Sequence, residues 1–137
     1  MIGETGWPRG GRFRPHKTHQ NGLSVDFFVP VRDARGRPAV VPTRPWTRFG
    51  YGLDFDAEGR LGDLSIDFDA LAAHLLALAE SGRGHGVAID FVILDPGLQP
   101  LLFRTPKGQL LRARMRFSTR PAWVRHDEHY HVDFRLL

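Results

Sequence analysis

The clearest pattern of apolar positions in the chain predicts one long helix. The helix begins after Asp67, a good N-cap residue, and ends at Ser81 and Gly82. Its apolar residues follow the i, i+3, i+4, i+7 spacing of a helix that lies on a sheet: Phe68, Leu71, Ala72, Leu75, Leu76 and Ala79. A second, shorter and Arg-rich helix is predicted over residues 108–117.

Strands are predicted where β-branched and aromatic residues gather between turn residues. They cover residues 23–31, 46–55, 61–66, 87–94, 122–124 and 130–136, with a turn at 57–60. Residues 1–15 are interpreted as an irregular arm, and residues 32–45 as a loop. Because helices and strands do not alternate regularly, we expect an α+β fold with a small antiparallel sheet. The 137 residues fit a single domain, 1–137, around one core.

Composition excludes several kinds of site. The chain has no cysteine, which excludes disulfides, thiolate zinc fingers and a cysteine nucleophile, so a metal would need His and carboxylate ligands. No apolar run is long enough to span a bilayer. Residues 1–11 lack the apolar stretch of a signal peptide, so the sequence predicts no export signal and leaves the delivery route open.

The chain is basic, with 19 Lys and Arg against 15 Asp and Glu. Such an excess suits an anionic partner, or reflects a genome that favours Arg codons. The cations are spread along the chain, and neither a helix-turn-helix nor an RNP pattern is present. We therefore expect no nucleic-acid partner, although a nucleic-acid-binding domain remains an alternative that predicts salt-dependent binding.

Five of the seven histidines fall in two clusters that lie about a hundred residues apart. The first runs from His16 through His19 to Asp26, and the second holds His126, His129 and His131. Histidine is the most common metal ligand and general base near neutral pH. The two remaining histidines, His74 and His85, are expected to be solvated.

Strand geometry predicts which side chains of the clusters share a face. In the second cluster, His129, His131 and Asp133 lie on one face, opposite an apolar set that packs in the core: Tyr130, Val132, Phe134 and Leu136. Asp26 lies inside an apolar strand, which is costly unless its charge is paired or coordinated. A positive φ at Gly22 would let the side chains of His19 and Asp26 meet. Two His and one Asp are typical of a catalytic zinc site.

These motifs resemble a known family. HxxGxxxD (His19, Gly22, Asp26) followed by HxH (His129, His131) is similar to the lysostaphin, D-Ala-D-Ala peptidase and hedgehog group of zinc proteins. Residues 10–22 and 125–132 resemble the two motifs of the penicillin-insensitive murein endopeptidases. The resemblance implies one zinc ion held by His19, Asp26 and His131, and cleavage of peptide cross-links between peptidoglycan stem peptides, of the D-Ala to diaminopimelate type, in the cell wall.

The resemblance also implies roles beside the metal. His129 is expected as the base or transition-state stabiliser, with His126 and His16 lining the site. Glu128 forms ExxH with His131, the pattern that holds the catalytic Glu of related D-Ala-D-Ala peptidases, so either His129 or Glu128 can be the base.

Several supporting roles are interpretations of single residues. Asp133 or Asp127 can orient an imidazole. Three arginines, Arg12, Arg14 and Arg125, are candidates for binding substrate carboxylates.

Two other functions stay open for the same residues. A D,D-carboxypeptidase or dipeptidase would use the same site on free stem peptides. A non-catalytic zinc-binding module would need the three ligands and no base. Neither the organism, the partner proteins nor the oligomeric state follows from the sequence.

Overall fold

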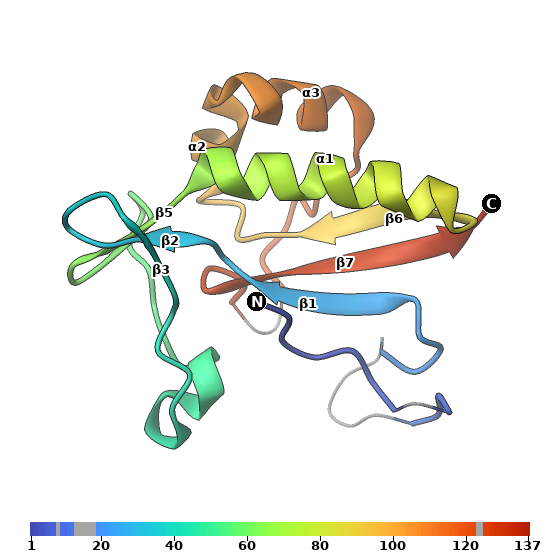
Figure 1. Ribbon diagram of the computed structural model, residues 1–137, viewed down its shortest axis with the longest axis horizontal. Helices are drawn as coiled ribbons and strands as arrows, with labels where there is room; N and C mark the ends of the chain where they lie inside the picture. The colour runs from blue at the N-terminus through green and yellow to red at the C-terminus, as the bar shows by residue number, and fades with distance from the viewer. Residues whose placement is uncertain (8, 13–18, 123–124) are drawn as a thin grey trace.

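The computed structural model describes residues 1–7, 9–12, 19–122 and 125–137. The fold is α+β, as predicted, with two small antiparallel sheets (Figure 1). The described elements follow the order β1 (Ser24–Phe28), β2 (Val31–Arg32), β3 (Pro38–Ala39), the 3-10 helix η1 (Pro45–Gly50), β4 (Arg60–Leu61), β5 (Leu64–Ile66), α1 (Phe68–Gly84), β6 (Val87–Ile93), α2 (Gln99–Arg104), α3 (Pro106–Arg114) and β7 (His129–Leu136).

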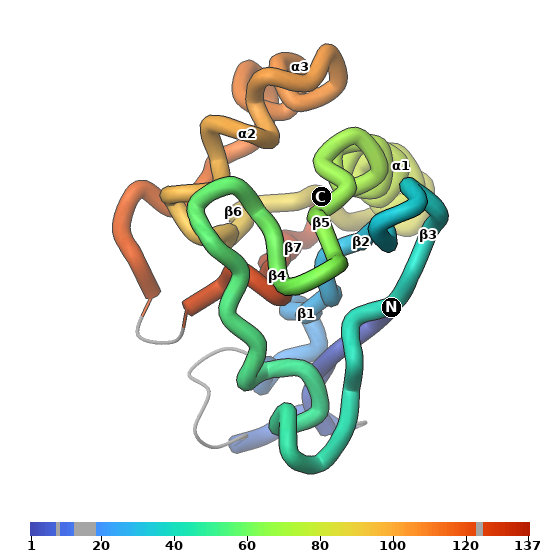
Figure 2. The backbone as a smooth tube through the Cα atoms, turned by 90° about the vertical axis from the view of Figure 1, so that its left-hand side faces the viewer, coloured from blue at the N-terminus to red at the C-terminus, as the bar shows by residue number. Residues whose placement is uncertain are grey.

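The main sheet has the strand order β1-β7-β6, with both pairs antiparallel. The helices α1, α2 and α3 lie on one side of this sheet (Figures 1 and 2). The second sheet, β3-β2-β5-β4, extends from the end of β1. The face of the main sheet that α1 leaves uncovered is therefore free to carry polar groups.

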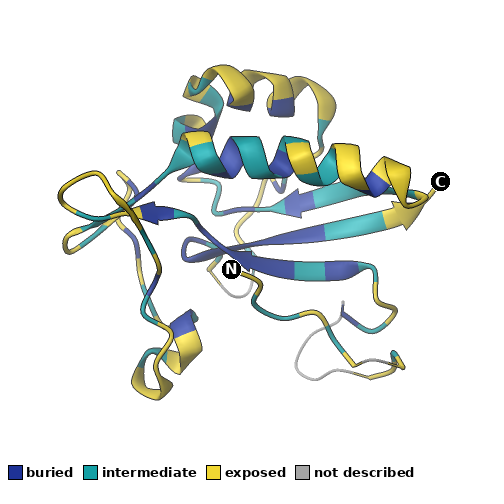
Figure 3. Cartoon of the chain, in the orientation of Figure 1, coloured by how far each residue is buried: buried dark blue, intermediate teal, exposed yellow. Residues whose placement is uncertain are grey.

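The core lies between α1 and the main sheet. Its fully buried members from these elements are Leu71, Ala72, Leu75, Val92 and Val132. Figure 3 shows the buried residues of α1 on the side that faces the sheet. Truncating one such leucine to alanine costs about 2–5 kcal/mol of stability, because a cavity remains. This core fixes the position of β7, which carries the second histidine cluster.

The predicted long helix is confirmed as α1, and Asp67 caps it by accepting a hydrogen bond from the backbone N–H of Ala70 at 3.0 Å. The helix ends at Gly84 instead of Gly82. Gly82 is buried inside its last turn, where a Cβ would lie 3.2 Å from the carbonyl oxygen of Val87. Gly82 thus allows close packing of α1 on β6, and does not terminate the helix.

The predicted strand over residues 46–55 is wrong. The hydroxyl of Thr47 donates a hydrogen bond of 2.7 Å to the carbonyl of Pro42. Arg48 and Phe49 adopt left-handed backbone angles. These local bonds and the glycines Gly50 and Gly52 favour a 3-10 turn, η1, over an extended strand.

Other expected boundaries also shift. The strand predicted over 23–31 divides at Pro30 into β1 and β2. No helix was predicted around Pro100, where the structure has α2. Pro100 lies in the first turn of this helix, where a proline is tolerated. The strand predicted over 122–124 lies largely outside the described residues.

The first residues of the predicted irregular arm are bonded to the main sheet, which the sequence pattern did not indicate. They pair with the free edge of β1: Gly3 donates its N–H to the carbonyl of Asp26 at 2.7 Å, and Asp26 donates to the carbonyl of Glu4 at 2.8 Å. Ile2 forms an antiparallel bridge with Phe27. The arm therefore shields the backbone of β1 beside Asp26. Within the described ranges, no helix is both long and apolar enough to cross a membrane.

Candidate metal centre

Strand register places the two histidine clusters together. Asp26 of β1 lies directly opposite His131 of β7, Ser24 opposite Asp133, and Phe28 opposite His129. Side chains of such facing pairs share one face of the sheet. The predicted apolar face of β7 is confirmed for Tyr130 and Val132, which are buried, and for Phe134, which packs partly against the core. It is wrong for Leu136, which is 71% exposed near the end of the strand.

His19 reaches this face from a bend that precedes β1. His19 itself has φ 59°, and Gly22 has φ 75°, as predicted for the glycine. Gly6, with φ 112°, passes so close that a Cβ would lie 2.1 Å from the carbonyl oxygen of His19. Two left-handed residues and a close glycine contact thus fold the segment just before β1 onto this face of the sheet.

Three donor atoms from His19, Asp26 and His131 converge on one point. Nε2 of His19 lies 3.1 Å from Nδ1 of His131 and 3.3 Å from Oδ1 of Asp26. Nδ1 of His131 lies 2.8 Å from the same oxygen. All three residues are buried, with 1–3% of their surface exposed. This group could hold a metal ion.

The second nitrogen of His131 is also occupied. Its Nε2 lies 2.8 Å from Oδ1 of Asp133, and that oxygen accepts a hydrogen bond from the hydroxyl of Ser24 at 2.6 Å. A carboxylate on the outer nitrogen of an imidazole fixes its orientation and raises its basicity, as at many metal sites. Of the two aspartates expected to orient an imidazole, Asp133 is the one that contacts His131.

Burial and hydrogen bonds oppose each other in this group. Burial alone would raise the pKa of Asp26, but the hydrogen bonds of His131 and His19 outweigh it and lower the pKa well below its ordinary value. Burial disfavours the charged form of His131, yet Asp133 and Asp26 raise its pKa to about 9. The two aspartates thus favour positive charge at His131.

His129 lies next to the triad formed by His19, Asp26 and His131, and it is buried. Its Nδ1 lies 2.9 Å from Oε1 of Glu128, and its ring centroid lies 4.3 Å from that of His126. Burial lowers the pKa of His129 to about 4 and raises the pKa of Glu128. Burial therefore favours the neutral form of His129 over its protonated form at pH 7. His126 is half-buried, with its ring centroid 6.5 Å from that of His131.

Tyr51 is a neighbour of the site that the sequence did not predict. Its ring lies edge-on to His129, with the centroids 4.8 Å apart, and to Phe28 at 5.2 Å. Burial raises the pKa of its hydroxyl, and the nearby carboxylate of Asp26 adds to this effect. Tyr51 follows η1, in the segment that was predicted as a strand, so no pattern in the sequence indicated its position.

Two expected roles are not supported by the geometry. Arg125 was a candidate for substrate carboxylates, but its guanidinium binds Asp95 at 2.9 Å and the carbonyl of Phe55 at 2.7 Å. Asp127 was a candidate for orienting an imidazole, but it accepts the N–H of Phe55 at 2.6 Å and pairs with Arg125 at 3.4 Å. Both residues hold the segment before β7 against the rest of the fold.

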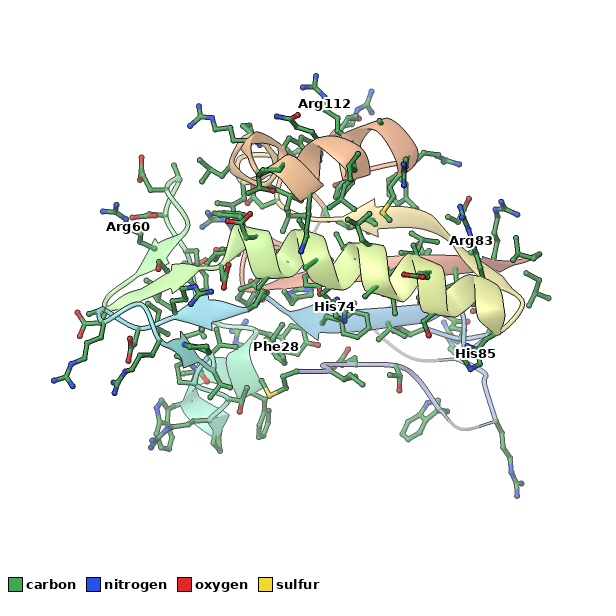
Figure 4. The ribbon with its side chains drawn as sticks, turned by 45° about the horizontal axis from the view of Figure 1, so that its top comes forward. Phe28, Arg60, His74, Arg83, His85 and Arg112 are labelled. Carbon is green, nitrogen blue, oxygen red and sulfur yellow. The ribbon has the colours of Figure 1, made fainter. Side chains whose placement is uncertain are left out.

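The remaining candidates divide into three groups. His16 and Arg14 lie outside the described residues, and Arg12 is exposed. His85 is exposed at the end of α1, as predicted, whereas the prediction of a solvated His74 is wrong (Figure 4). His74 lies 2.5 Å from the hydroxyl of Tyr130 and packs edge-on against Phe27. Its position on α1 faces the sheet, which the apolar stripe did not indicate.

Comparisons with known proteins give one curated relative and no matching family model. The chain is similar to a protein named penicillin-insensitive murein endopeptidase from Salmonella heidelberg (strain SL476), with 27% identity over 139 aligned positions. The alignment covers 98% of this chain and 44% of that protein, so the chain spans less than half the length of this relative.

Proposed function

We propose that residues 1–137 form a zinc-dependent peptidoglycan endopeptidase domain that cleaves peptide cross-links of the D-Ala to diaminopimelate type at the cell wall. The observation that carries the proposal is the convergence of His19, Asp26 and His131 on one buried point. The name of the curated relative supports the same reaction class.

The donor set fits zinc. Zinc bonds to His nitrogen and carboxylate oxygen are about 2.0–2.2 Å long, so the ligand atoms of a tetrahedral site lie about 3.3–3.6 Å apart. The corresponding atoms of His19, Asp26 and His131 lie 2.8–3.3 Å apart, so only a small expansion would be needed. When bound at such a site, zinc supplies Lewis acidity, which lowers the pKa of water and polarises a carbonyl group.

His129 is the residue we assign as general base. Glu128, as a carboxylate, accepts a hydrogen bond from Nδ1 of His129, which leaves Nε2 as the free acceptor nitrogen. The low pKa of His129 keeps the ring neutral, so it can take a proton from water and return it to the leaving amine. Glu128 orients His129 in this assignment, and it remains the alternative base.

His126 and His16 complete the proposed set. The ring of His126 lies tilted against that of His129, with the centroids 4.3 Å apart, so its imidazole is beside the proposed base, where an N–H can stabilise a developing oxyanion. His16 is proposed for the same role on the strength of the sequence motif alone. His19, Asp26 and His131 act as ligands, and Asp133 orients His131.

Digestion of purified cross-linked muropeptides separates this function from its alternatives. An endopeptidase converts dimers to monomers, whereas a D,D-carboxypeptidase or dipeptidase shortens free stem peptides and leaves dimers intact. A non-catalytic module binds zinc and releases nothing. Chromatography of the products, with a His131→Ala variant as the inactive control, identifies which of the three is correct.

A further inference from the structure

Two large aromatic side chains project from η1 into solvent. Trp46 is 75% exposed and Phe49 is 64% exposed, and only two residues separate them. Single exposed apolar residues are normal on protein surfaces, whereas larger exposed apolar surfaces mark interaction sites, and here two large rings are exposed on one short turn. The guanidinium of Arg44 lies 5.3 Å from the centroid of the Trp46 ring, and exposed Arg48 lies between the two aromatics in the sequence.

This loop has a defined shape. Thr47 accepts the N–H of Arg44 at 2.9 Å and donates its hydroxyl to the carbonyl of Pro42 at 2.7 Å. Arg48 and Phe49 hold left-handed backbone angles, with φ 49° and 57°. Non-glycine residues adopt such angles only where the surroundings enforce them. The aromatic rings are therefore presented on an ordered turn at little entropic cost.

The same loop is attached to the candidate metal centre. Gly50, with φ 108°, packs so tightly that a Cβ would lie 2.5 Å from Cε1 of Phe28. The next residue, Tyr51, contacts His129. In Figure 1 the rest of η1 extends away from the sheet. Trp46 and Phe49 thus lie at most five residues along the chain from Tyr51, which contacts His129.

We infer that Trp46 and Phe49, with Arg44 and Arg48, form a docking surface for the glycan strand of peptidoglycan. This inference rests on the proposed function, and it adds a binding site for the sugar part of the polymer. Aromatic faces stack on the C–H faces of sugar rings, as they do on other apolar groups. Among the ion pairs of the described residues, none involves Arg44 or Arg48, so both cations can meet the carboxylates of the polymer.

The test is binding to insoluble peptidoglycan on ice, measured by sedimentation. A Trp46→Ala/Phe49→Asn variant removes both rings and keeps a residue that tolerates the left-handed angles. It should bind at least about tenfold more weakly, a change of about 1.4 kcal/mol. The matched control is Leu136→Ala, which removes a side chain that is 71% exposed at the far end of β7, and it should bind normally.

Three probes identify the occupant. The wild-type chain should bind glycan strands freed of peptides, and an Arg44→Gln/Arg48→Gln variant should bind intact peptidoglycan with a weaker salt dependence. Normal binding by the double aromatic variant would overturn the inference. So would a wild-type chain that ignores peptide-free strands, or one that prefers vesicles of anionic lipid.

The same variants separate this inference from the proposed function. The double aromatic variant should cleave cross-linked peptide dimers that carry no sugar at the wild-type rate, because such dimers lack the glycan that the two rings would bind. If the wild-type chain cleaves no substrate, the proposed function fails, while the binding comparison still decides the docking surface. Equal loss of binding and of soluble-dimer cleavage would instead indicate damage to the fold, and would contradict a separate docking role.

Discussion

His131 lies directly opposite Asp26 across the β1–β7 pair, with its Nδ1 2.8 Å from the carboxylate oxygen. This contact joins two segments that are more than a hundred residues apart in the sequence. His19 completes the group from outside the sheet, and Asp133 contacts the other nitrogen of His131. The imidazole of His131 is thus fixed from both sides, which is the arrangement expected of a metal ligand.

Asp133→Asn should weaken metal binding without removing it. The amide cannot support His131 as a carboxylate does, so the affinity for zinc should fall by about 10–100-fold. Competition with a chelator of known affinity measures this change. Asp90→Asn is the matched control, because Asp90 lies on β6 and is 43% exposed beside Arg116. Equal zinc affinities for the two variants would exclude a role for Asp133 at the site.

His129→Ala should keep zinc and lose turnover. The side chain is outside the group of His19, Asp26 and His131 that we propose as ligands, and its loss removes the proposed base while Asp26 and His131 stay in place. General-base catalysis contributes about 10²–10⁴-fold, so the rate on cross-linked dimers should fall by that factor.

Glu128→Gln is the companion variant. It keeps the hydrogen bond to His129 and removes the charge, so a moderate loss is expected. Full activity in His129→Ala, with a collapse in Glu128→Gln, would transfer the role of base to Glu128.

The metal-free chain should lose stability in acid partly through His129. Burial lowers its pKa to about 4 in the folded state, from an ordinary 6.5. The neutral imidazole of His129 therefore makes its full contribution to the free energy of unfolding above pH 6.5. That contribution falls between pH 6.5 and pH 4, because only the unfolded chain binds the proton there, and the total loss is about 3 kcal/mol at most. Chemical denaturation of the chelated protein measures this loss. A His129→Gln variant should show a flatter decline, whereas His85→Gln should match the wild type, since His85 is exposed.

Arg125 should contribute more stability than an ordinary surface arginine. Its guanidinium joins Asp95, Asp127 and the carbonyl of Phe55, and Asp127 is fully buried. Removing the cation would leave that carboxylate with less compensation, at a cost of about 1–3 kcal/mol.

The matched control is Arg37→Met, which breaks an exposed pair with Asp33 worth less than about 1 kcal/mol. Denaturant unfolding of both variants tests the comparison. Equal effects of Arg125→Met and Arg37→Met would show that Arg125 does not anchor the segment before β7.

Periodic patterns predicted the elements that position the site. The cap at Asp67 and the apolar spacing predicted α1, and alternation along β7 correctly separated His131 from Val132. These features follow from the local geometry of helices and strands, which the order of residues expresses directly. The grouping of His19, Asp26 and His131 was implied by the resemblance of the two motifs to a known family.

Other features depend on contacts between distant segments. Tyr51 reaches His129 only because η1 turns where a strand was predicted, and that turn depends on left-handed angles at Arg48 and Phe49. The partners of Arg125 and the contact of His74 with Tyr130 likewise arise from tertiary packing. Local sequence patterns carry no signal for such contacts, which explains why these predictions were wrong or missing.

Metal analysis of the purified protein tests the central claim most directly. The wild-type chain should retain about one zinc ion per chain after it is incubated with zinc and the unbound zinc is removed. His19→Ala and His131→Ala should each lose it, while His85→Ala should retain it. A wild-type chain that binds no zinc, or triad variants that bind it as tightly as the wild type, would contradict the account.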